Sequence, residues 1–348
     1  MRTSFLFGEK KKVWRIFKMT KTLTLPNAYQ PLLDVKRTEI CIKVIKELFE
    51  EEFAEALNVM EVSAPLLLLE GTGLNDNLNG VERFITFDAL DIEPSHIQFV
   101  QSLAKWKRMA LHTYNFMIGE GLYTNMKAIR RDEVLDNLHS IYVDQWDWEK
   151  VITKEQRSLT TLRTEVLKIY EAMKAVENYL YKFNPLLTPI LPEHIHFVTT
   201  FELEEMYPAL SPKQREDAIT EKHGAVFVMQ IGGELKSGEK HDGRSPDYDD
   251  WNLNGDIVFW NPLLQSSFEV SSMGIRVDEK TMLEQLKVAN NEDRKELHYH
   301  KSLLNGELPY TIGGGIGQSR QKEGSALNIF VQDAAKNKSK LTKVVVTK

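Results

Sequence analysis

The chain has 348 residues, of which 42% are hydrophobic and 27% charged, with a single cysteine. This composition excludes collagenous, disordered and disulfide-stapled proteins and fits one large or two ordinary globular domains. The formal net charge is −6, but residues 1–30 contribute +6 and residues 321–348 contribute +4, which leaves −16 on the body. So acidic a body argues against nonspecific nucleic-acid binding, and no apolar run approaches the roughly 18 residues of a membrane span.

The basic N-terminal end is expected to lie outside the folded body. Residues 1–28 scatter Lys and Arg among Phe, Val and Trp without the long apolar segment of a secretion signal, so we expect a flexible extension, with organelle targeting as the alternative. Cys41 has no second cysteine to pair with, which indicates a reducing compartment, and we expect the cytoplasm.

Hydrophobic periodicity predicts the main elements in chain order. A helix is expected over residues 34–57, with Asp34 as N-cap, and another from Ile97 to Tyr114 after a capping box at Pro94-Ser95-x-x-Gln98. Further helices are expected over 153–184 and 280–304, and strands over 59–63, 139–149, 225–231, 256–260, 268–277 and 310–316. Strands occur in blocks separated by long helices and do not alternate with helices as in βαβ units. The pattern therefore predicts an α+β fold of two layers, with a mainly antiparallel sheet flanked by helices.

The segment 139–149 has two chemically different faces if it is a strand. Alternation places Gln145, Asp147 and Glu149 on one face and Tyr142, Trp146 and Trp148 on the other. Trp rings favour the core, so the carboxylates are expected to line either solvent or a cleft.

A second acidic segment follows later in the chain. Four aspartates, Asp247, Asp249, Asp250 and Asp256, lie within ten residues, so we expect a cation near some of them: a metal, a substrate amine or lysines. If the strands that carry Asp256 and Glu269 are antiparallel neighbours, the two carboxylates could hold one Mg²⁺ together with ATP phosphates.

The glycine-rich segment 312–320 matches neither common phosphate loop, because Gln318 stands where a G-x-G-x-x-G frame needs glycine and no Gly-Lys-Ser/Thr follows. Either a flat base or backbone approaches these glycines closely, with Arg320 beyond them, or they form a tight turn. Lys107 falls on the apolar side of its helix and could be partly buried, whereas the cluster 105–108 otherwise reads as a solvated face. Cys41 is interpreted as a structural cysteine, and the pairs His194-x-His196 and His298-x-His300 as surface or core histidines, because no third metal ligand stands near either pair.

Six segments, taken together and in order, resemble the ammonia-dependent asparagine synthetase (aspartate-ammonia ligase) family over about residues 29–320. They are Ser102-Leu-Ala-Lys-Trp-Lys-Arg108, Gly119-Glu-Gly-Leu-Tyr-Thr124, Tyr142-Val-Asp-Gln-Trp-Asp-Trp-Glu149, Pro246-Asp-Tyr-Asp-Asp-Trp251, Ser271-Ser-Met-Gly-Ile-Arg276 and Thr311-Ile-Gly-Gly-Gly-Ile-Gly-Gln-Ser-Arg320. That family is similar to the catalytic core of class II aminoacyl-tRNA synthetases. Here Val62-Ser-Ala-Pro65 resembles the dimer-forming first motif, Arg130 with Glu133 the second, and Gly315 to Arg320 the third.

The resemblance implies that residues 29–320 form a catalytic domain that converts L-aspartate, ammonia and ATP to asparagine, AMP and pyrophosphate through a β-aspartyl-adenylate. It implies a homodimer, with no nucleic-acid or membrane partner. The implied nucleotide-binding residues are Arg130, Glu133 and Arg320, with Asp256 and Glu269 holding Mg²⁺. The implied aspartate-binding residues are Lys107, Gln145, Asp147, Asp249, Ser271, Ser272 and Arg276, and Asp76 would bind ammonium and take its proton.

Three functional alternatives are distinguished by what the sequence lacks. A glutamine-hydrolysing enzyme needs a nucleophile that Cys41 does not suit, and a tRNA-charging enzyme needs an anticodon-binding module that does not fit before Asp34. A non-catalytic relative is favoured only by the C-terminus, where residues 321–348 form a divergent lysine-rich tail. Strict alternation also separates Glu269 from Arg276, so a shared pocket requires a bulge at Ser272-Met-Gly274.

Overall fold

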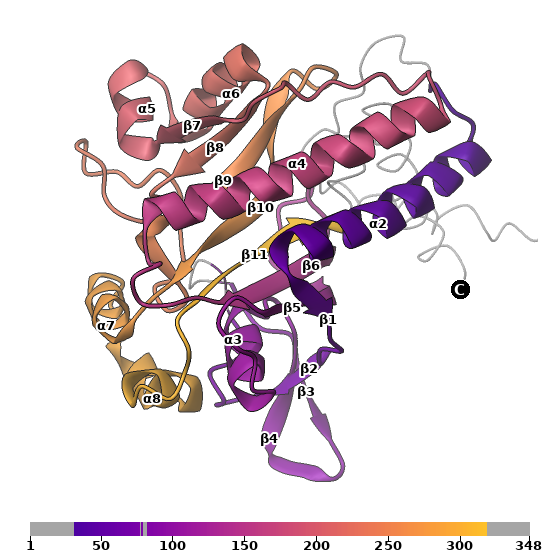
Figure 1. Cartoon of the computed structure of the whole chain (residues 1–348). Helices are drawn as coiled ribbons and strands as arrows, with labels where there is room; N and C mark the ends of the chain where they lie inside the picture. Colours follow the sequence, from indigo (N-terminus) through magenta and orange to yellow (C-terminus); the bar gives the residue numbers. More distant parts are fainter. Residues whose placement is uncertain (1–30, 77, 79–81, 319–348) are drawn as a thin grey trace, which may run out of the picture.

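The computed structural model describes residues 31–76, 78 and 82–318 (Figure 1). The helices are α2 (Val35–Leu57), α3 (Ala104–Thr113), α4 (Leu159–Phe183), α5 (Thr200–Met206), α6 (Pro212–His223), α7 (Glu279–Val288), the 3-10 helix η1 (Glu292–Glu296) and α8 (His298–Leu304). The strands are β1 (Val59–Glu61), β2 (Leu67–Leu69), β3 (Thr86–Ala89), β4 (Ile92–Phe99), β5 (Gly121–Ile129), β6 (Tyr142–Val151), β7 (His196–Thr199), β8 (Ala225–Met229), β9 (Asp249–Asn261), β10 (Ser266–Arg276) and β11 (Thr311–Gly317). The basic extension 1–28 and the tail 321–348 lie outside the described residues.

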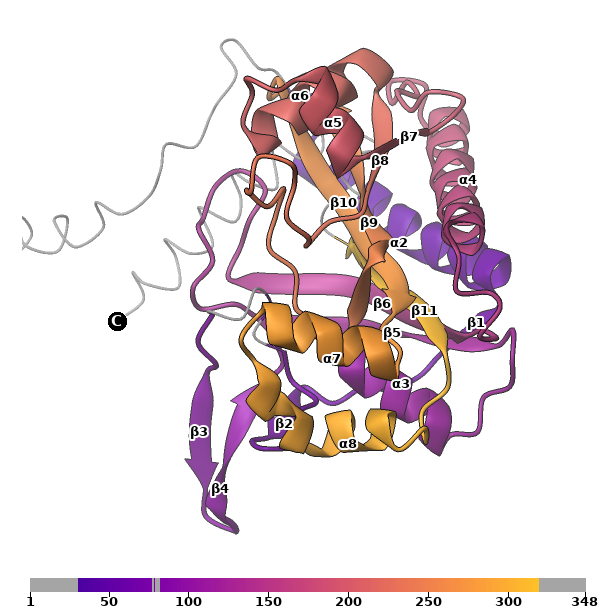
Figure 2. The ribbon, with the colours of Figure 1, turned by 90° about the vertical axis from the view of Figure 1, so that its left-hand side faces the viewer.

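Eight strands form one sheet in the order β1-β5-β6-β11-β10-β9-β8-β7, and β2, β4 and β3 form a small second sheet (Figure 2). The five inner pairings of the large sheet are antiparallel, but β1 runs parallel to β5 and β7 runs parallel to β8. The predicted α+β class is confirmed, while the mainly antiparallel sheet is corrected to a mixed sheet with a parallel pair at each edge. The edge strands are only three and four residues long, too short for alternation to reveal their direction.

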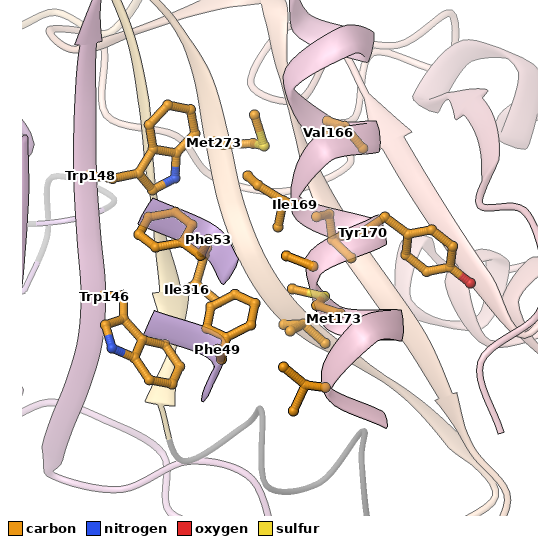
Figure 3. Packing of buried hydrophobic residues seen from close by; sticks show 14 of the residues in the cluster. Phe49, Phe53, Trp146, Trp148, Val166, Ile169, Tyr170, Met173, Met273 and Ile316 are labelled. Carbon is orange, nitrogen blue, oxygen red and sulfur yellow. The ribbon is translucent and has the colours of Figure 1, made fainter. Parts of the chain in front are cut away.

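The core lies on one face of the sheet, beneath α2 and α4 (Figures 1 and 3). Phe49 and Phe53 of α2 pack onto Trp146 and Trp148 of β6, and the ring centroids of Phe49 and Trp146 are 4.8 Å apart. All four side chains are fully buried, each stabilising the fold by roughly 2–3 kcal/mol. The prediction that the aromatic face of 139–149 belongs to the core is confirmed at both tryptophans; Tyr142 is 51% exposed.

The opposite face of the sheet is covered only in parts. At one end, α5 and α6 bury valines of β7, β8 and β9. At the other end, α3 packs against β5, β6 and β11. Between these covers, this face carries charged and polar side chains of β6, β9 and β10 and the glycines of β11, so a functional site can form there.

Two predicted helices differ from the structure. The segment Pro94 to Gln98 lies inside strand β4, so the capping-box prediction was wrong and the helix begins only at Ala104. Hydrogen bonds to β2 and β3 hold β4 as the central strand of the small sheet, which local capping chemistry cannot foresee. The predicted helix 280–304 is divided into α7, η1 and α8, with Asn290 in the left-handed region at φ 55° between the first two.

Candidate active site

One row of residues crosses four strands on the polar face. The register pairs Asp256 with Ser272, Ser272 with Gly315, and Gly315 with Asp147. Neighbouring strands are about 4.8 Å apart, so the row spans about 14 Å, long enough for an extended ligand. Asp256 and Asp147 are each only 4% exposed, and Gln145 continues the row's face two residues along β6.

Glycines in β11 make room for the charged side chains beside them. A Cβ atom on Gly313 would lie 2.1 Å from Oε2 of Glu149 and 2.7 Å from Nη2 of Arg276. A Cβ on Gly315 would lie 2.7 Å from Oε1 of Gln145. These distances support the prediction that other groups approach the glycines closely, and within the chain those groups are side chains. The alternative of a tight turn was wrong, because residues 311–317 are a strand.

Arg276 joins the charged groups of three strands. Its Nε and Nη2 donate to both oxygens of Glu149 at 2.7–3.0 Å, and its Nη1 donates to Oδ1 of Asp249. Burial alone would raise the pKa of Glu149, but the guanidinium of Arg276 holds it below its usual value. For Asp249 burial prevails and the pKa is raised. Asp249 is thus the carboxylate of this group that gains most from an additional positive charge.

Lys107 is more deeply buried than the sequence predicted. Its ammonium is fully enclosed and donates to Oδ1 of Asp147 at 2.5 Å and to the carbonyls of Trp148 at 2.9 Å and Gly314 at 3.1 Å. Burial lowers the pKa of this ammonium, while Asp147 and Glu149 oppose that effect. All three hydrogen-bond donors of Lys107 are occupied, so Lys107 fixes the position of Asp147 within the row.

Glu269 and Arg276 share one face of β10 because the strand contains a bulge. The register against β9 slips between Glu269 and Ser271, so one extra residue of β10 is inserted there. The predicted bulge is therefore confirmed in kind, but it lies just before Ser272-Met-Gly274. Glu269 then lies on the same face as Asp256, where its charge acts on both Asp256 and Arg244.

Asp256 has the chemistry of a cation ligand. Arg244 donates to its Oδ2, but its Oδ1 is buried without a hydrogen-bond partner. Burial raises the pKa of Asp256 to about 7, so a second cation would restore its charge. No group of three or more His, Cys, Asp or Glu that could hold a metal exists among residues 31–76, 78 and 82–318. Mg²⁺ bound with a nucleotide needs only one or two carboxylates besides phosphate oxygens and water, and Asp256 with Glu269 fits that donor set.

Asp76 lies in a buried loop that follows β2. The side chain of Asn75 accepts from the backbone N–H of Asp76 at 3.1 Å and so holds the loop, and Oδ1 of Asp76 accepts from the hydroxyl of Ser245 at 3.1 Å. The ammonium of Lys105 is 3.7 Å from the same oxygen. Oδ2 of Asp76 is buried without a partner, and burial raises the pKa of this carboxyl to about 6.

The remaining predicted residues are partly located. Arg130 directly follows β5, and its Nη1 is 3.9 Å from Oε2 of Glu133, with both side chains about one-fifth exposed. The hydroxyl of Ser271 is fully buried with no hydrogen-bond partner, and Ser272 is half-buried in the row. Arg320 lies outside the described residues.

Sequence reasoning missed three residues of this region. Lys105 was assigned to a solvated helix face, yet it is 3% exposed and donates to Asp247 at 3.1 Å, so that assignment was wrong. Asp247 is fully buried and also accepts from His300, while Arg244 reaches Asp256 from a loop. The acidic run 247–256 did signal buried cations; it could not say which ones, because they come from distant segments.

Other predictions concern bulk properties and isolated histidines. None of the helices in the described part of the chain is long and apolar enough to cross a membrane. Cys41 is buried in α2, as expected for a structural residue. The ring of His196 stacks on that of His223 with centroids 3.9 Å apart, and His300 is buried against Asp247.

Comparison with known proteins identifies the family. A family model described as aspartate-ammonia ligase matches residues 36–323. Proteins named aspartate–ammonia ligase from Clostridium tetani and Clostridium perfringens are each 59% identical, over 87% and 86% of this chain and 89% of their own length. A third, from Ruminiclostridium cellulolyticum, is 60% identical over 86% of this chain and 89% of its own.

Solved structures agree at the level of the fold. Asparaginyl-tRNA synthetase from Entamoeba histolytica in complex with asparaginyl-adenylate has a TM-score of 0.56 at 12% identity, and covers 83% of this chain and 64% of its own. The Pyrococcus horikoshii enzyme complexed with the same adenylate has a TM-score of 0.55 at 13% identity, over 86% and 68%. The class II synthetase-like fold expected from the sequence is thereby confirmed. On the family match and the relatives' identity together, this chain belongs to the aspartate-ammonia ligase family.

Proposed function

We propose that the protein condenses L-aspartate with ammonia at the expense of ATP, giving asparagine, AMP and pyrophosphate through a β-aspartyl-adenylate. Family membership supports the overall reaction. The location is supported by the row from Asp256 to Asp147, whose two end carboxylates are buried, with Arg244 beside the first and Lys107 beside the second. Such a row suits a nucleotide at one end and, at the other, an amino acid with two carboxylates and an ammonium.

Aspartate binds at the β6 end of the row, where its charged groups replace one partner in each of the protein's own ion pairs. The substrate ammonium satisfies Asp147 and Asp249, and this frees Nη1 of Arg276 for a substrate carboxylate. Lys107 contributes its positive charge beside that carboxylate, while Gln145 and Ser272 supply hydrogen bonds. Ser271 was expected to add a third, but it pairs in register with Ile257 and Ile316 of the core, so its hydroxyl lies on the face away from Asp147.

ATP lies against the same face of the sheet, with Asp256 of β9 on one side of it and Arg130, which follows β5, on the other. Arg130 holds the α-phosphate and Glu133 helps to place the adenine, while Arg320 contacts the far end of the nucleotide. Asp256 and Glu269 would hold Mg²⁺, which when bound offsets the negative charge of the phosphates. Arginine suits these positions because its planar fork binds phosphate oxygens through two parallel hydrogen bonds.

The reaction has two displacements. The side-chain carboxylate oxygen of aspartate forms a bond to the α-phosphorus as the bond to pyrophosphate breaks, and Arg130 stabilises the charge on the phosphoryl oxygens. Ammonia then forms a bond to the acyl carbon, and the bond to AMP breaks. Asp76 holds the ammonium and takes its proton before the attack, for which a carboxylate ionised near neutral pH is required.

The catalytic unit is proposed to be residues 29–320, with 1–28 and 321–348 as additions, and to act as a homodimer. Met60 and Leu69, near the segment Val62 to Pro65 that resembles the dimer-forming motif, are 59% and 46% exposed, which supports association there. Light scattering coupled to gel filtration tests this proposal, and a monomer at micromolar concentration would contradict it.

The function is tested by measuring AMP release and asparagine with aspartate, ATP and ammonium, each omitted in turn, with and without tRNA. We expect AMP and asparagine in equal amounts, dependent on ammonium and unaffected by tRNA. Aspartate- or asparagine-dependent charging of tRNA would favour the synthetase alternative, and no AMP release at all would favour a non-catalytic relative. Arg130→Ala is expected to abolish adenylate formation, and near-normal AMP release by that variant would refute its role.

A further inference from the structure

A buried group of charged residues lies behind Asp76 and takes no part in the reaction as described above. Asp247 is at its centre, and each of its oxygens is occupied. Oδ2 accepts from Lys105 at 3.1 Å, from Arg294 at 3.1 Å and from His300 at 2.9 Å. Oδ1 accepts from the hydroxyl of Ser245 at 2.7 Å.

Two of these partners connect Asp247 to Asp76. The hydroxyl of Ser245 lies between the two carboxylates and shares its single proton between Oδ1 of Asp247 and, at 3.1 Å, Oδ1 of Asp76. The ammonium of Lys105 also lies between the two carboxylates, 3.7 Å from that same Oδ1. Lys105 is 3% exposed and Asp247 and His300 are fully buried, so none of these contacts competes freely with water. Asp76 is thus held at Oδ1 alone, while Oδ2 is left without a partner.

The loop that carries Asp76 is supported from the same side. Gly73, at φ +74°, packs so closely on α8 that a Cβ there would lie 2.9 Å from Cβ of Leu297 and 3.2 Å from Nδ1 of His300. The backbone N–H of Tyr299 donates to the carbonyl of Thr72 at 3.3 Å. His300 therefore leaves no room for a side chain at Gly73 and also donates to Asp247.

We infer that Lys105, Asp247 and His300 form a positioning relay that holds Asp76 by one oxygen and sets its charge, leaving the other oxygen for ammonium. This inference rests on the proposed function, in which Asp76 binds ammonium. The relay consists of positioning residues, because each acts through Asp76. It makes the affinity for the nitrogen donor depend on Lys105 and Asp247, which the donor does not touch.

The charges that act on Asp76 give the relay a measurable sign. The charged groups are Lys105 of α3, Asp247 of the loop before β9 and Arg294 of η1. The hydroxyls of Ser245 and Tyr248 also face Asp76, and His300 acts on it through Asp247. Burial raises the pKa of Asp76 most, Lys105 lowers it and Asp247 raises it. Loss of the Lys105 charge therefore raises the pKa of Asp76 further, and less carboxylate remains to hold ammonium near neutral pH. Loss of the Asp247 charge acts in the opposite direction.

The test uses the full-length chain and separates the two half-reactions. Aspartate-dependent exchange of pyrophosphate into ATP, without ammonium, reports adenylate formation, and asparagine synthesis at varied ammonium reports the second step. For Lys105→Met we expect exchange to persist while KM for ammonium rises about twofold near pH 7, approaches a tenfold rise near pH 5 and is unchanged near pH 9, as a one-unit rise in the pKa of Asp76 from about 6 requires. In the wild type, KM for ammonium should rise as the pH falls and Asp76 becomes protonated. Asp247→Asn should move this rise to lower pH, because loss of the Asp247 charge lowers the pKa of Asp76. Lys280→Met, an exposed lysine of α7, is the matched control and should change neither.

Several outcomes overturn the relay. An unchanged KM for ammonium in folded Lys105→Met would do so, as would a rise in KM that is the same at every pH and accompanied by lost exchange. Should Lys105→Met not fold, Ser245→Ala tests the same sign, because that hydroxyl also lowers the pKa of Asp76; no acid-side rise in KM in this variant would contradict the relay. Absence of exchange in the wild type would instead defeat the proposed function.

Discussion

Arg276 holds Glu149 through two guanidinium nitrogens, with Nε at 2.9 Å and Nη2 at 2.7 Å from the carboxylate, and both side chains are buried. Removing one partner of such a pair leaves an uncompensated buried charge, which costs about 3–5 kcal/mol. We predict that Glu149→Gln lowers the free energy of unfolding by about 3 kcal/mol, measured by urea denaturation. The matched control is Glu284→Gln, which breaks an exposed pair with Lys280 and should change stability by less than about 0.5 kcal/mol. Equal effects of the two variants would show that the buried pair has no special weight.

Gly313 provides a second test of the same site. A methyl group there would overlap Oε2 of Glu149, so Gly313→Ala must displace the buried ion pair. We expect this variant to lose aspartate-dependent pyrophosphate exchange and to melt at lower temperature. Gly233→Ala is the control, because nothing lies within 4 Å of its Cβ position, and it should retain exchange. A fully active Gly313→Ala would contradict the packing of β11 against the site.

Lys107 tests the β6 end of the row. Its ammonium bonds Asp147 and two backbone carbonyls, so Lys107→Met leaves all three acceptors without this donor. We expect KM for aspartate in the exchange reaction to rise about a hundredfold, corresponding to about 2.7 kcal/mol of lost binding. KM for ATP should change much less, and an equal rise in both constants would show general misfolding of the site.

The carboxylates at the other end of the row are expected to act on Mg²⁺ and ATP alone. Asp256→Asn keeps the shape of the side chain but removes the charge that a cation needs. The Mg²⁺ concentration for half-maximal exchange should rise at least about tenfold, and Glu269→Gln should act in the same direction. Binding of aspartate, measured by calorimetry without nucleotide, should be unchanged. A normal Mg²⁺ dependence in both variants would remove Asp256 and Glu269 from that role.

The sequence predicts local features well where one face of an element is uniform. Helix α2 begins after Asp34 as expected, and the alternation in β6 correctly separated Trp146 and Trp148 from Asp147 and Glu149. Prediction failed where distant segments decide. Lys105 reads as a surface residue until Asp247, 142 positions away, is brought beside it. In the same way the segment Pro94 to Gln98 resembles a helix start, but pairing with β2 and β3 makes it a strand.

Family resemblance supplied the site residues, and the geometry adds how they are held. The sequence could not indicate that Arg276 bridges Glu149 and Asp249, nor that Arg244 neutralises Asp256, because these contacts depend on strand register and loop position. The need for a bulge in β10 was deducible, since Glu269 and Arg276 must share a face. Its place just before Ser272 was not, because several adjacent residues could accommodate an extra residue.

The central claim is that aspartate is activated by attack of its own side-chain carboxylate on the α-phosphorus of ATP. Aspartate labelled with heavy oxygen in that carboxylate tests this directly, by mass spectrometry of the nucleotide product after turnover with ammonium. We expect one heavy oxygen atom in AMP and the remaining one in the asparagine amide. Heavy oxygen in inorganic phosphate, with ADP as the nucleotide product, would contradict it.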